Sequence, residues 1–374
     1  MVMSQSDMCL NPPVSTVDRE HAKISWRVSK RCQLIWRCIL WMSIFRWIYA
    51  IVKCTEAVFL DFNMKDFPVH ITLTSVYSLC ILWMYCCFIR SPDIMTLVVN
   101  SFVKAEDYKG AIDWKSLNLQ EMLVLQLPFN IVIFPILYLI LLLLEPDSKC
   151  FIYGTMSLYW ESNWLLYTSI LVEVLLMFLL ANICSFSSFL VLMFLERCTE
   201  QIRKQSWILG TRRFGVSRPE NKIRIAYRHC RQLQLTIQLF NLGFSYGIFL
   251  LKIHSIATSI VMYSFAILLS KSSLILTAIY FTTGIQCSLL FSIMFQKAFS
   301  IPVGILACKR RMLNWIKVFT TDQTEQYYYR SVRSIYDVGI NVGSFHKFQR
   351  VSTPVFLDYV IKFSARVLIA FSKA

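Results

Sequence analysis

Charged residues are scarce in this sequence: they make up 16% of its 374 residues, against about 25% in a typical soluble domain. Glycine and proline occur ten times each, which excludes collagen-like and low-complexity disordered chains. The sequence contains no Walker phosphate loop and no GxGxxG, HExxH or CxxC motif, and its five histidines are scattered. Because these are the patterns that carry nucleotide, redox and metal chemistry, we expect no enzyme activity, no cofactor and no metal site.

Hydrophobic residues account for 56% of the chain, including 28 phenylalanines. A hydrocarbon core about 30 Å thick requires roughly 20 apolar residues of α-helix, and seven stretches satisfy this requirement. They are residues 33–52, 70–89, 122–144, 164–195, 240–269, 273–295 and 351–371. The sequence therefore predicts an all-α polytopic membrane protein, whose transmembrane domain is residues 33–371. The first and last stretches contain charged residues, so six spans with one of these in the interface is the alternative.

The distribution of basic residues predicts the orientation in the membrane. The net charge is +16, which in a soluble protein would suggest nucleic acid as a partner. Between the predicted spans, however, 28 Lys and Arg lie on one side and five on the other. By the positive-inside rule, the N-terminus is cytosolic and the C-terminus extracellular. We expect a cytosolic N-terminal segment, residues 1–32, and no nucleic-acid partner.

The predicted cytosolic segments are much longer than the external ones. Residues 196–239 and 296–350 are expected to form an anchor region below the membrane, because helices at 164–195 and 240–269 are longer than a bilayer requires. The fourth helix should continue past Glu200, and the fifth should begin near Tyr227. Apolar residues between Val332 and Ile340 suggest a further helix.

Ionisable residues inside the predicted spans are the informative ones, because a charge in hydrocarbon costs several kcal/mol unless it is paired or hydrated. Glu173 lies in the fourth span, and it either pairs with a basic residue or touches a polar ligand. Arg46 is deep in the first span, and Lys252, in the middle of the fifth, could be the partner of Glu173. On the external side, Cys54 and Cys150 could form a disulfide, although spacing alone does not fix the pairing.

The last span carries a regular pattern of charge. Asp358, Lys362 and Arg366 are spaced by four residues, which places them along one face of a helix. This stripe is either an Asp358–Lys362 pair with Arg366 at the interface, or a surface that faces water in a conduction pathway. We favour the second interpretation. The opposite face offers Val360, Phe363 and Val367 to protein or lipid.

These features together resemble the insect seven-transmembrane chemoreceptors, most closely the gustatory receptors. The resemblance covers the whole chain in length, number of spans, cytosolic N-terminus and long sixth loop. The segment from Ile340 to Phe345 resembles the small-residue and Phe turn that precedes the family's final helix. The family's signature is Thr-Tyr, five apolar residues and Gln-Phe. The nearest register here runs from Phe363-Ser364 to Ala370-Phe371, where only Phe371 matches.

The resemblance implies a ligand-gated, non-selective cation channel of four identical or different subunits in the plasma membrane of sensory neurons. Its ligand would be a small-molecule tastant, and its other partners permeant cations and membrane lipid. The seventh helix of each subunit would line the pore, so the implied pore-lining residues are Asp358, Lys362, Arg366 and Phe371. The family's ligand pocket lies in the outer half of the second to sixth spans. Residues at that depth with mixed aromatic and polar character are Tyr77, Tyr138, Tyr167, Glu173, Tyr263 and Tyr280.

The main alternative is a G-protein-coupled receptor. That class has an external N-terminus, which the charge distribution opposes. It also has an acidic-Arg-aromatic triplet after the third span, and this sequence has Leu144-Glu145-Pro146-Asp147 there instead. The last span contains Thr353-Pro354 but no Asn-Pro-x-x-Tyr motif. An insect odorant receptor and a transporter are further alternatives. A transporter would be favoured by two similar halves or glycine-broken spans, and neither is present.

Overall fold

The computed structural model describes residues 16–18, 23–25, 30–59, 67–90, 94, 98, 100, 119–144, 146, 148–156, 162–210, 219–271, 273–319, 322–349 and 352–372. Most of the predicted N-terminal segment 1–32 and of the loop between the second and third predicted spans lies outside these residues.

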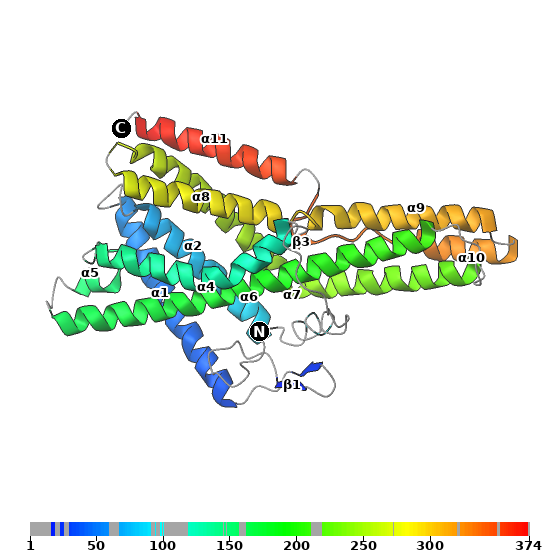
Figure 1. The fold of residues 1–374 in the computed structure, drawn as a ribbon, viewed down its shortest axis with the longest axis horizontal. Helices are drawn as coiled ribbons and strands as arrows, with labels where there is room; N and C mark the ends of the chain where they lie inside the picture. Colours follow the sequence, from blue (N-terminus) through cyan, green and yellow to red (C-terminus); the bar gives the residue numbers. More distant parts are fainter. Residues whose placement is uncertain are drawn as a thin grey trace.

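The chain is built from long helices that run side by side (Figure 1). The helices are α1 (Lys30–Phe59), α2 (Phe67–Met84), the π-helix η1 (Tyr85–Arg90), α4 (Leu119–Leu144), α5 (Ile152–Met156), α6 (Asn163–Gly210), α7 (Pro219–Leu268), α8 (Leu274–Met294), the 3-10 turn η2 (Ala298–Ser300), α9 (Ile301–Phe319), α10 (Asp322–Arg333) and α11 (Ser352–Ser372). Two short antiparallel hairpins complete the described part, β1 (Thr16–Asp18) with β2 (Lys23–Ser25), and β3 (Asn341–Val342) with β4 (His346–Lys347). The predicted all-helical membrane architecture is confirmed.

In the described part of the chain, six helical segments are long and apolar enough to cross a membrane. Five lie within α1, α2, α4, α6 and α7, and the sixth starts with α8. The seventh predicted span is α11, a helix of 21 residues. It falls outside the six because every 18-residue stretch of it contains Asp358, Lys362 and Arg366. The predicted reversal at Ser270 to Ser272 is confirmed, since α7 ends at Leu268 and the Ser273 side chain caps the start of α8.

Helices α6 and α7 are far longer than a bilayer is thick. They contain 48 and 50 residues, about 72 and 75 Å at 1.5 Å per residue. Both continue past the rest of the bundle, where α9 and α10 lie beside them at the right of Figure 1. We call this part, formed by the C-terminal end of α6, the N-terminal end of α7, α9 and α10, the extension. The predicted continuation past Glu200 is confirmed.

One detail of the predicted sixth loop is wrong. The helix expected through Val332 to Ile340 ends with α10 at Arg333, and the chain then runs without regular structure to β3. Ile335, Val338 and Ile340 are nevertheless buried in the main core. Two exposed residues separate Ile335 from three consecutive buried ones, Val338, Gly339 and Ile340. Their spacing therefore reflects how this irregular segment packs against the core, and it follows no helical repeat.

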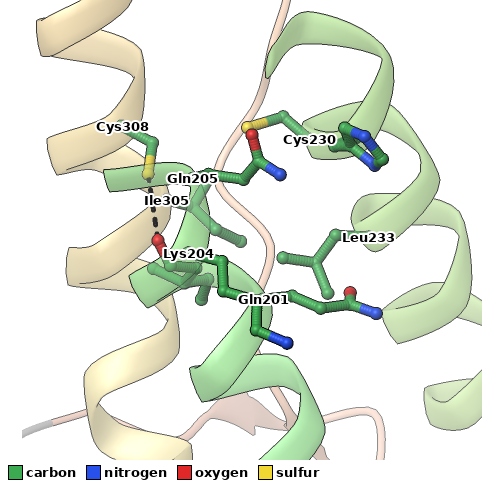
Figure 2. A pocket seen from close by; sticks show the side chains of 9 residues that line it. Gln201, Lys204, Gln205, Cys230, Leu233, Ile305 and Cys308 are labelled. Atoms are coloured by element: carbon green, nitrogen blue, oxygen red, sulfur yellow. Dashed lines mark hydrogen bonds between the residues drawn. The ribbon is translucent and has the colours of Figure 1, made fainter. Parts of the chain in front are cut away.

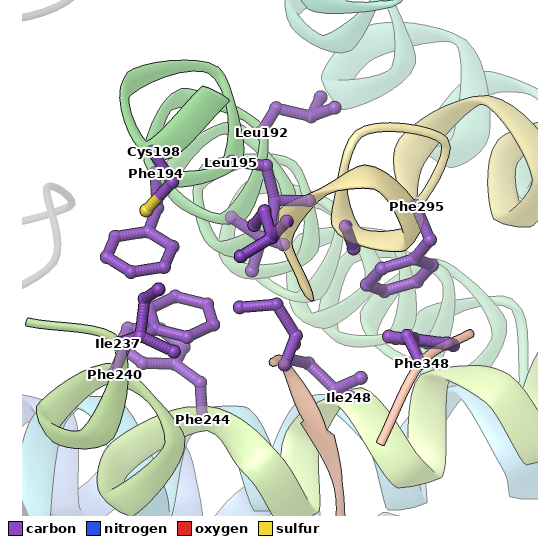
Figure 3. Packing of buried hydrophobic residues seen from close by; sticks show 14 of the residues in the cluster. Leu192, Phe194, Leu195, Cys198, Ile237, Phe240, Phe244, Ile248, Phe295 and Phe348 are labelled. Atoms are coloured by element: carbon purple, nitrogen blue, oxygen red, sulfur yellow. The ribbon is translucent and has the colours of Figure 1, made fainter. Parts of the chain in front are cut away.

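Stacked phenylalanines hold the bundle and the extension together. Phe240 of α7 lies face to face with Phe194 of α6, with ring centroids 3.9 Å apart, and 4.6 Å from Phe244 (Figure 3). On the other side of the same core, Phe295 packs on Phe348, with centroids 4.5 Å apart. The core is therefore continuous from α6 through α7 to the segment that leads into α11.

The hairpin before α11 is fastened to α7. The Asn241 amide donates to the Gly339 carbonyl and accepts from the Asn341 N–H, both at 2.9 Å. Gly343 has a φ of 60°, a conformation that glycine adopts without a steric penalty, and its N–H donates to the Ser245 carbonyl at 2.9 Å. The predicted turn from Ile340 to Phe345 is thus the turn of this hairpin.

We predict that Phe240→Ala destabilises the protein by about 3–5 kcal/mol, the usual cost of removing a buried phenylalanine. Leu242→Ala, two residues further along at an exposed position of the same helix, is the matched control and should cost much less. Thermal unfolding of the purified protein, followed by size-exclusion fluorescence, measures the difference. Equal unfolding temperatures for the two variants would contradict the role assigned to the stack.

Candidate ligand site and pore helix

A buried ion pair lies between α1 and α6. The Arg46 Nη2 and Glu173 Oε2 atoms are 3.1 Å apart, and the two side chains are 2% and 1% exposed. Because a lone charge at this depth costs several kcal/mol, each side chain requires the other. Of the two interpretations left open for Glu173, the structure therefore shows pairing with a basic residue.

The remaining hydrogen bonds of this pair come from the segment around α5 and from α4. Arg46 Nη2 donates to the Cys150 carbonyl at 2.9 Å, and Glu173 Oε1 accepts from the Ile152 N–H at 2.7 Å. Tyr138 of α4 donates its hydroxyl to Glu173 Oε2. The pair thus joins α1, α4, α6 and the segment before α5 at one point.

Several polar atoms beside this ion pair have no hydrogen-bond partner among the described residues. The Arg46 guanidinium lies 5.0 Å from the ring centroid of Tyr49 and 5.5 Å from that of Tyr77, at distances where aromatic rings stabilise a cation. Arg46 Nε and Nη1 and the Tyr77 hydroxyl are buried and have no hydrogen-bond partner among the described residues. A molecule that accepts hydrogen bonds would therefore find donors here.

A row of polar side chains, mostly hydroxyls, lies between α2, α7 and α8. The Ser75 hydroxyl lies 2.9 Å from His254 Nδ1. One turn further along α7, the Ser259 and Ser288 hydroxyls are 3.0 Å apart, and Tyr263 donates to Ser288 at 3.3 Å. We call these five residues the hydroxyl seam. Sequence reasoning missed it because serine and threonine are frequent throughout the spans, so their spacing carried no signal.

The six predicted ligand residues fall in four places. Tyr77, Tyr138 and Glu173 lie together around Arg46. Tyr263 belongs to the hydroxyl seam, while Tyr280 is buried in a neighbouring cluster with Met262 and Phe265. Tyr167 is 64% exposed on the outside of α6 and is not brought together with the others.

The proposed partner of Glu173 is corrected by the structure. Lys252 Nζ lies 3.1 Å from His346 Nε2 in the hairpin before α11, and Arg46 occupies the place beside Glu173. Helical spacing gives the depth of a residue in the membrane but not the direction in which each helix turns, so depth alone could not choose between the two cations. No disulfide joins Cys54 to Cys150, both of which the structure describes.

On α11, the charged stripe lies on the uncovered side of the helix. Lys362 Nζ and Asp358 Oδ2 are 2.8 Å apart, with the two side chains 64% and 54% exposed. The Arg366 guanidinium lies over the Phe363 ring, 5.1 Å from its centroid. The three charges share one face as predicted, and the Asp358–Lys362 pair of the less favoured interpretation is present on it.

The buried face of α11 differs in part from the predicted one. Phe356, Val360 and Ser364 point into the protein, whereas Phe363 is on the exposed side. Phe363 lies seven residues from Phe356, at the edge of the buried face, and its side chain is 39% exposed. Phe371 is half-buried and packs edge-on against Phe265 of α7, with centroids 5.6 Å apart.

The structure supplies no metal-binding cluster: in the described ranges, no three His, Cys, Asp or Glu side chains gather closely enough to hold an ion. The fold and these sites define a polytopic helical membrane protein with a long extension on one side of the bundle and a charged last helix at its edge.

Comparison with known proteins supports this class through structure alone. No family model and no curated protein matches the sequence. Among solved structures, the chain is similar to the insect olfactory receptor OR5 from Machilis hrabei in complex with eugenol, with 11% identity, 97% of this chain and 95% of that chain covered, and a TM-score of 0.62. A second structure of this receptor gives 11% identity, coverage of 96% of this chain and 94% of that chain, and a TM-score of 0.64. The fold is thus that of the insect olfactory receptors.

We predict that Arg46→Met or Glu173→Leu alone destabilises the protein by about 3–5 kcal/mol, because each leaves one buried charge unpaired. The double variant should recover most of the loss, since no charge then remains in the apolar environment. Lys53→Met, which breaks the more exposed Lys53–Glu56 pair, is the control and should cost at most about 1 kcal/mol. Cell-surface amount and thermal unfolding of the four variants measure the cycle. Additive losses in the double variant would contradict the pairing.

Proposed function

We propose that this protein is a chemoreceptor subunit that forms a small-molecule-gated, non-selective cation channel in the plasma membrane. The observation that carries the proposal is the charged face of α11. Asp358, Lys362 and Arg366 lie exposed on a helix that packs on the bundle along one side. Since three ionisable groups are tolerable at this position only beside water or partner charges, this face is well suited to line an aqueous pore shared by several subunits.

The edge position of α11 supports an assembly. Figure 1 shows α11 on the outside of the bundle, next to α8. Its exposed face also carries large apolar side chains, among them Tyr359 and Ile361. A mixture of charged and apolar groups is unsuited to lipid alone, and it fits a helix whose neighbours are other copies of itself and a water-filled pathway. We propose four subunits, identical or different, as the resemblance implies.

A path for gating runs along α7. This helix carries the hydroxyl seam at one end of the bundle, and it holds the hairpin before α11 through Asn241, Ser245 and Lys252. Movement of α7 caused by a ligand at the seam would therefore be transmitted directly to the segment that begins the pore helix. A small shift is sufficient, because closely packed cores move between discrete arrangements.

The ligand site proposed is the region between Arg46 and the hydroxyl seam. The related receptor structure contains eugenol, a small molecule, and we infer a small-molecule ligand for this chain. Its contacts would come from the predicted residues Tyr77, Tyr138, Glu173, Tyr263 and Tyr280, with Tyr167 at the outer surface. The finer assignment, a gustatory receptor for a tastant in sensory neurons, rests on the resemblance of the sequence.

The alternative of a G-protein-coupled receptor differs in orientation. We predict that an epitope tag at the N-terminus is inaccessible to antibody in intact cells and becomes accessible after permeabilisation. A tag at the C-terminus should be accessible in both conditions. Surface immunofluorescence of the two tagged proteins makes the measurement. An N-terminal tag stained in intact cells would overturn the proposed orientation and favour the alternative.

We predict that Lys362→Glu and Arg366→Glu increase cation conductance in the assembled channel, because two positive charges near a pore repel the permeant ion. Lys271→Glu, the same charge reversal in the short loop between α7 and α8, is the matched control and should leave conductance unchanged. Single-channel recording under bi-ionic conditions gives both conductance and selectivity. Unchanged values for the α11 variants at normal surface expression would assign this face to packing instead of the pore.

A further inference from the structure

A cavity of about 190 Å³ lies within the extension, between α6, α7 and α9 (Figure 2). Its rim carries exposed polar side chains, Gln201, Lys204 and His229, and its floor is buried. The floor contains two cysteines from different helices, Cys230 of α7 and Cys308 of α9. This cavity belongs neither to the proposed ligand site nor to the pore helix.

The size of the cavity suits a very small organic molecule. A cavity of about 150 Å³ lined by apolar side chains binds benzene, so 190 Å³ can hold a compound with a few carbon atoms and one carbonyl group. Leu233 and Ile305 provide the apolar part of the wall. A compound with a short carbon chain would cover these two side chains, while its polar end lies near the side-chain amides of Gln201 and Gln205.

The surroundings of Cys308 favour a reactive thiol. Its Sγ lies 3.2 Å from the Ser206 hydroxyl, which can donate to a thiolate, and in the thiol form its S–H donates to the Ile202 carbonyl at 3.8 Å. Arg311 Nη1 donates to the Ser206 carbonyl at 2.7 Å, which holds a positive charge nearby. The neighbouring Cys230 thiol lowers the pKa of the Cys308 thiol, burial raises it, and Ser206 and Arg311 lower it, so this pKa lies below its ordinary value. The thiolate is the nucleophilic form of cysteine.

A hydrogen-bonding group for a carbonyl compound lies in the same cavity. The Gln205 side chain projects toward Cys230 in Figure 2, and its Oε1 atom is buried without a hydrogen-bond partner in the described part of the chain. Since the two ends of a side-chain amide exchange by a half-turn, Gln205 can instead present its N–H donors to a carbonyl oxygen. The cavity thus contains a nucleophile, a donor and an apolar wall.

We propose that Cys308 is a covalent modification site for small soft electrophiles of the α,β-unsaturated carbonyl class. The Cys308 thiolate donates its electron pair to the β-carbon of the compound, and a C–S bond forms as the C=C π bond breaks. The electrons move to the carbonyl oxygen, giving an enolate that Gln205 stabilises. The α-carbon then takes a proton from water, which leaves a neutral thioether and hydroxide. The adduct lies between α6, α7 and α9.

The test uses the full-length protein in lipid nanodiscs, first reduced and then freed of reductant. Methyl vinyl ketone is added for short times, and peptide mass spectrometry gives the extent of modification at each cysteine. Cys198, a buried thiol of α6 that does not line the cavity, is the internal reference. At pH 7 we expect Cys308 to react at least about tenfold faster than Cys198. As the pH is lowered, the rate at Cys308 should stay high well below about 8.5, the pKa of an ordinary thiol.

Variants and a second probe separate this site from a thiol that is merely accessible. Cys308→Ser should abolish the fast modification, and Cys198→Ser should leave it unchanged. Cys230→Ala, which removes the neighbouring thiol that lowers the pKa of Cys308, should slow it, whereas Cys230→Ser should slow it less. A bulky aryl enone should react much more slowly than methyl vinyl ketone. Equal rates at Cys308 and Cys198, an ordinary pH dependence, or equal rates for the two probes would overturn the proposal; these outcomes do not depend on whether the protein is a channel.

Discussion

The ion pair between Arg46 and Glu173 is the constraint on which the arrangement of the bundle depends. Both charges are buried at a depth where neither is tolerable alone. The pair also requires the Tyr138 hydroxyl, the Cys150 carbonyl and the Ile152 N–H, so four parts of the chain must meet at one place. This requirement fixes the relative positions of α1, α4 and α6, and it leaves the remaining donors of Arg46 directed toward the interior.

Helix α7 connects the parts that this pair and the rest of the core hold in place. It borders the hydroxyl seam, contributes the stacked Phe240 and Phe244, and fastens the hairpin before α11. The same continuous helix extends into the part of the molecule that lies beyond the bundle. The proposed ligand site, α11 and the Cys308 cavity are therefore linked by one helix of about 75 Å, which would make α7 the route of communication between them.

The helical elements could be predicted from the sequence because each depends on a local property. Runs of apolar residues gave the positions of the spans, and the spacing of Asp358, Lys362 and Arg366 gave their shared face on α11. The partner of Glu173 could not be predicted, because it depends on how α1 and α7 are rotated about their axes. The same reason applies to the hydroxyl seam, whose members become recognisable only when three helices are placed side by side. The path from Ile335 to Ile340 was misread as helix since the buried positions there reflect docking onto the extension.

The account as a whole depends on α11 lining a pathway shared by several subunits. Single-particle electron cryomicroscopy of the full-length protein in lipid nanodiscs tests this most directly, because it needs no knowledge of the ligand. The account predicts four subunits around a central axis, with the Asp358, Lys362 and Arg366 face of α11 toward that axis and the extensions in contact below the membrane. A monomer, or an assembly in which this face of α11 contacts lipid, would contradict it.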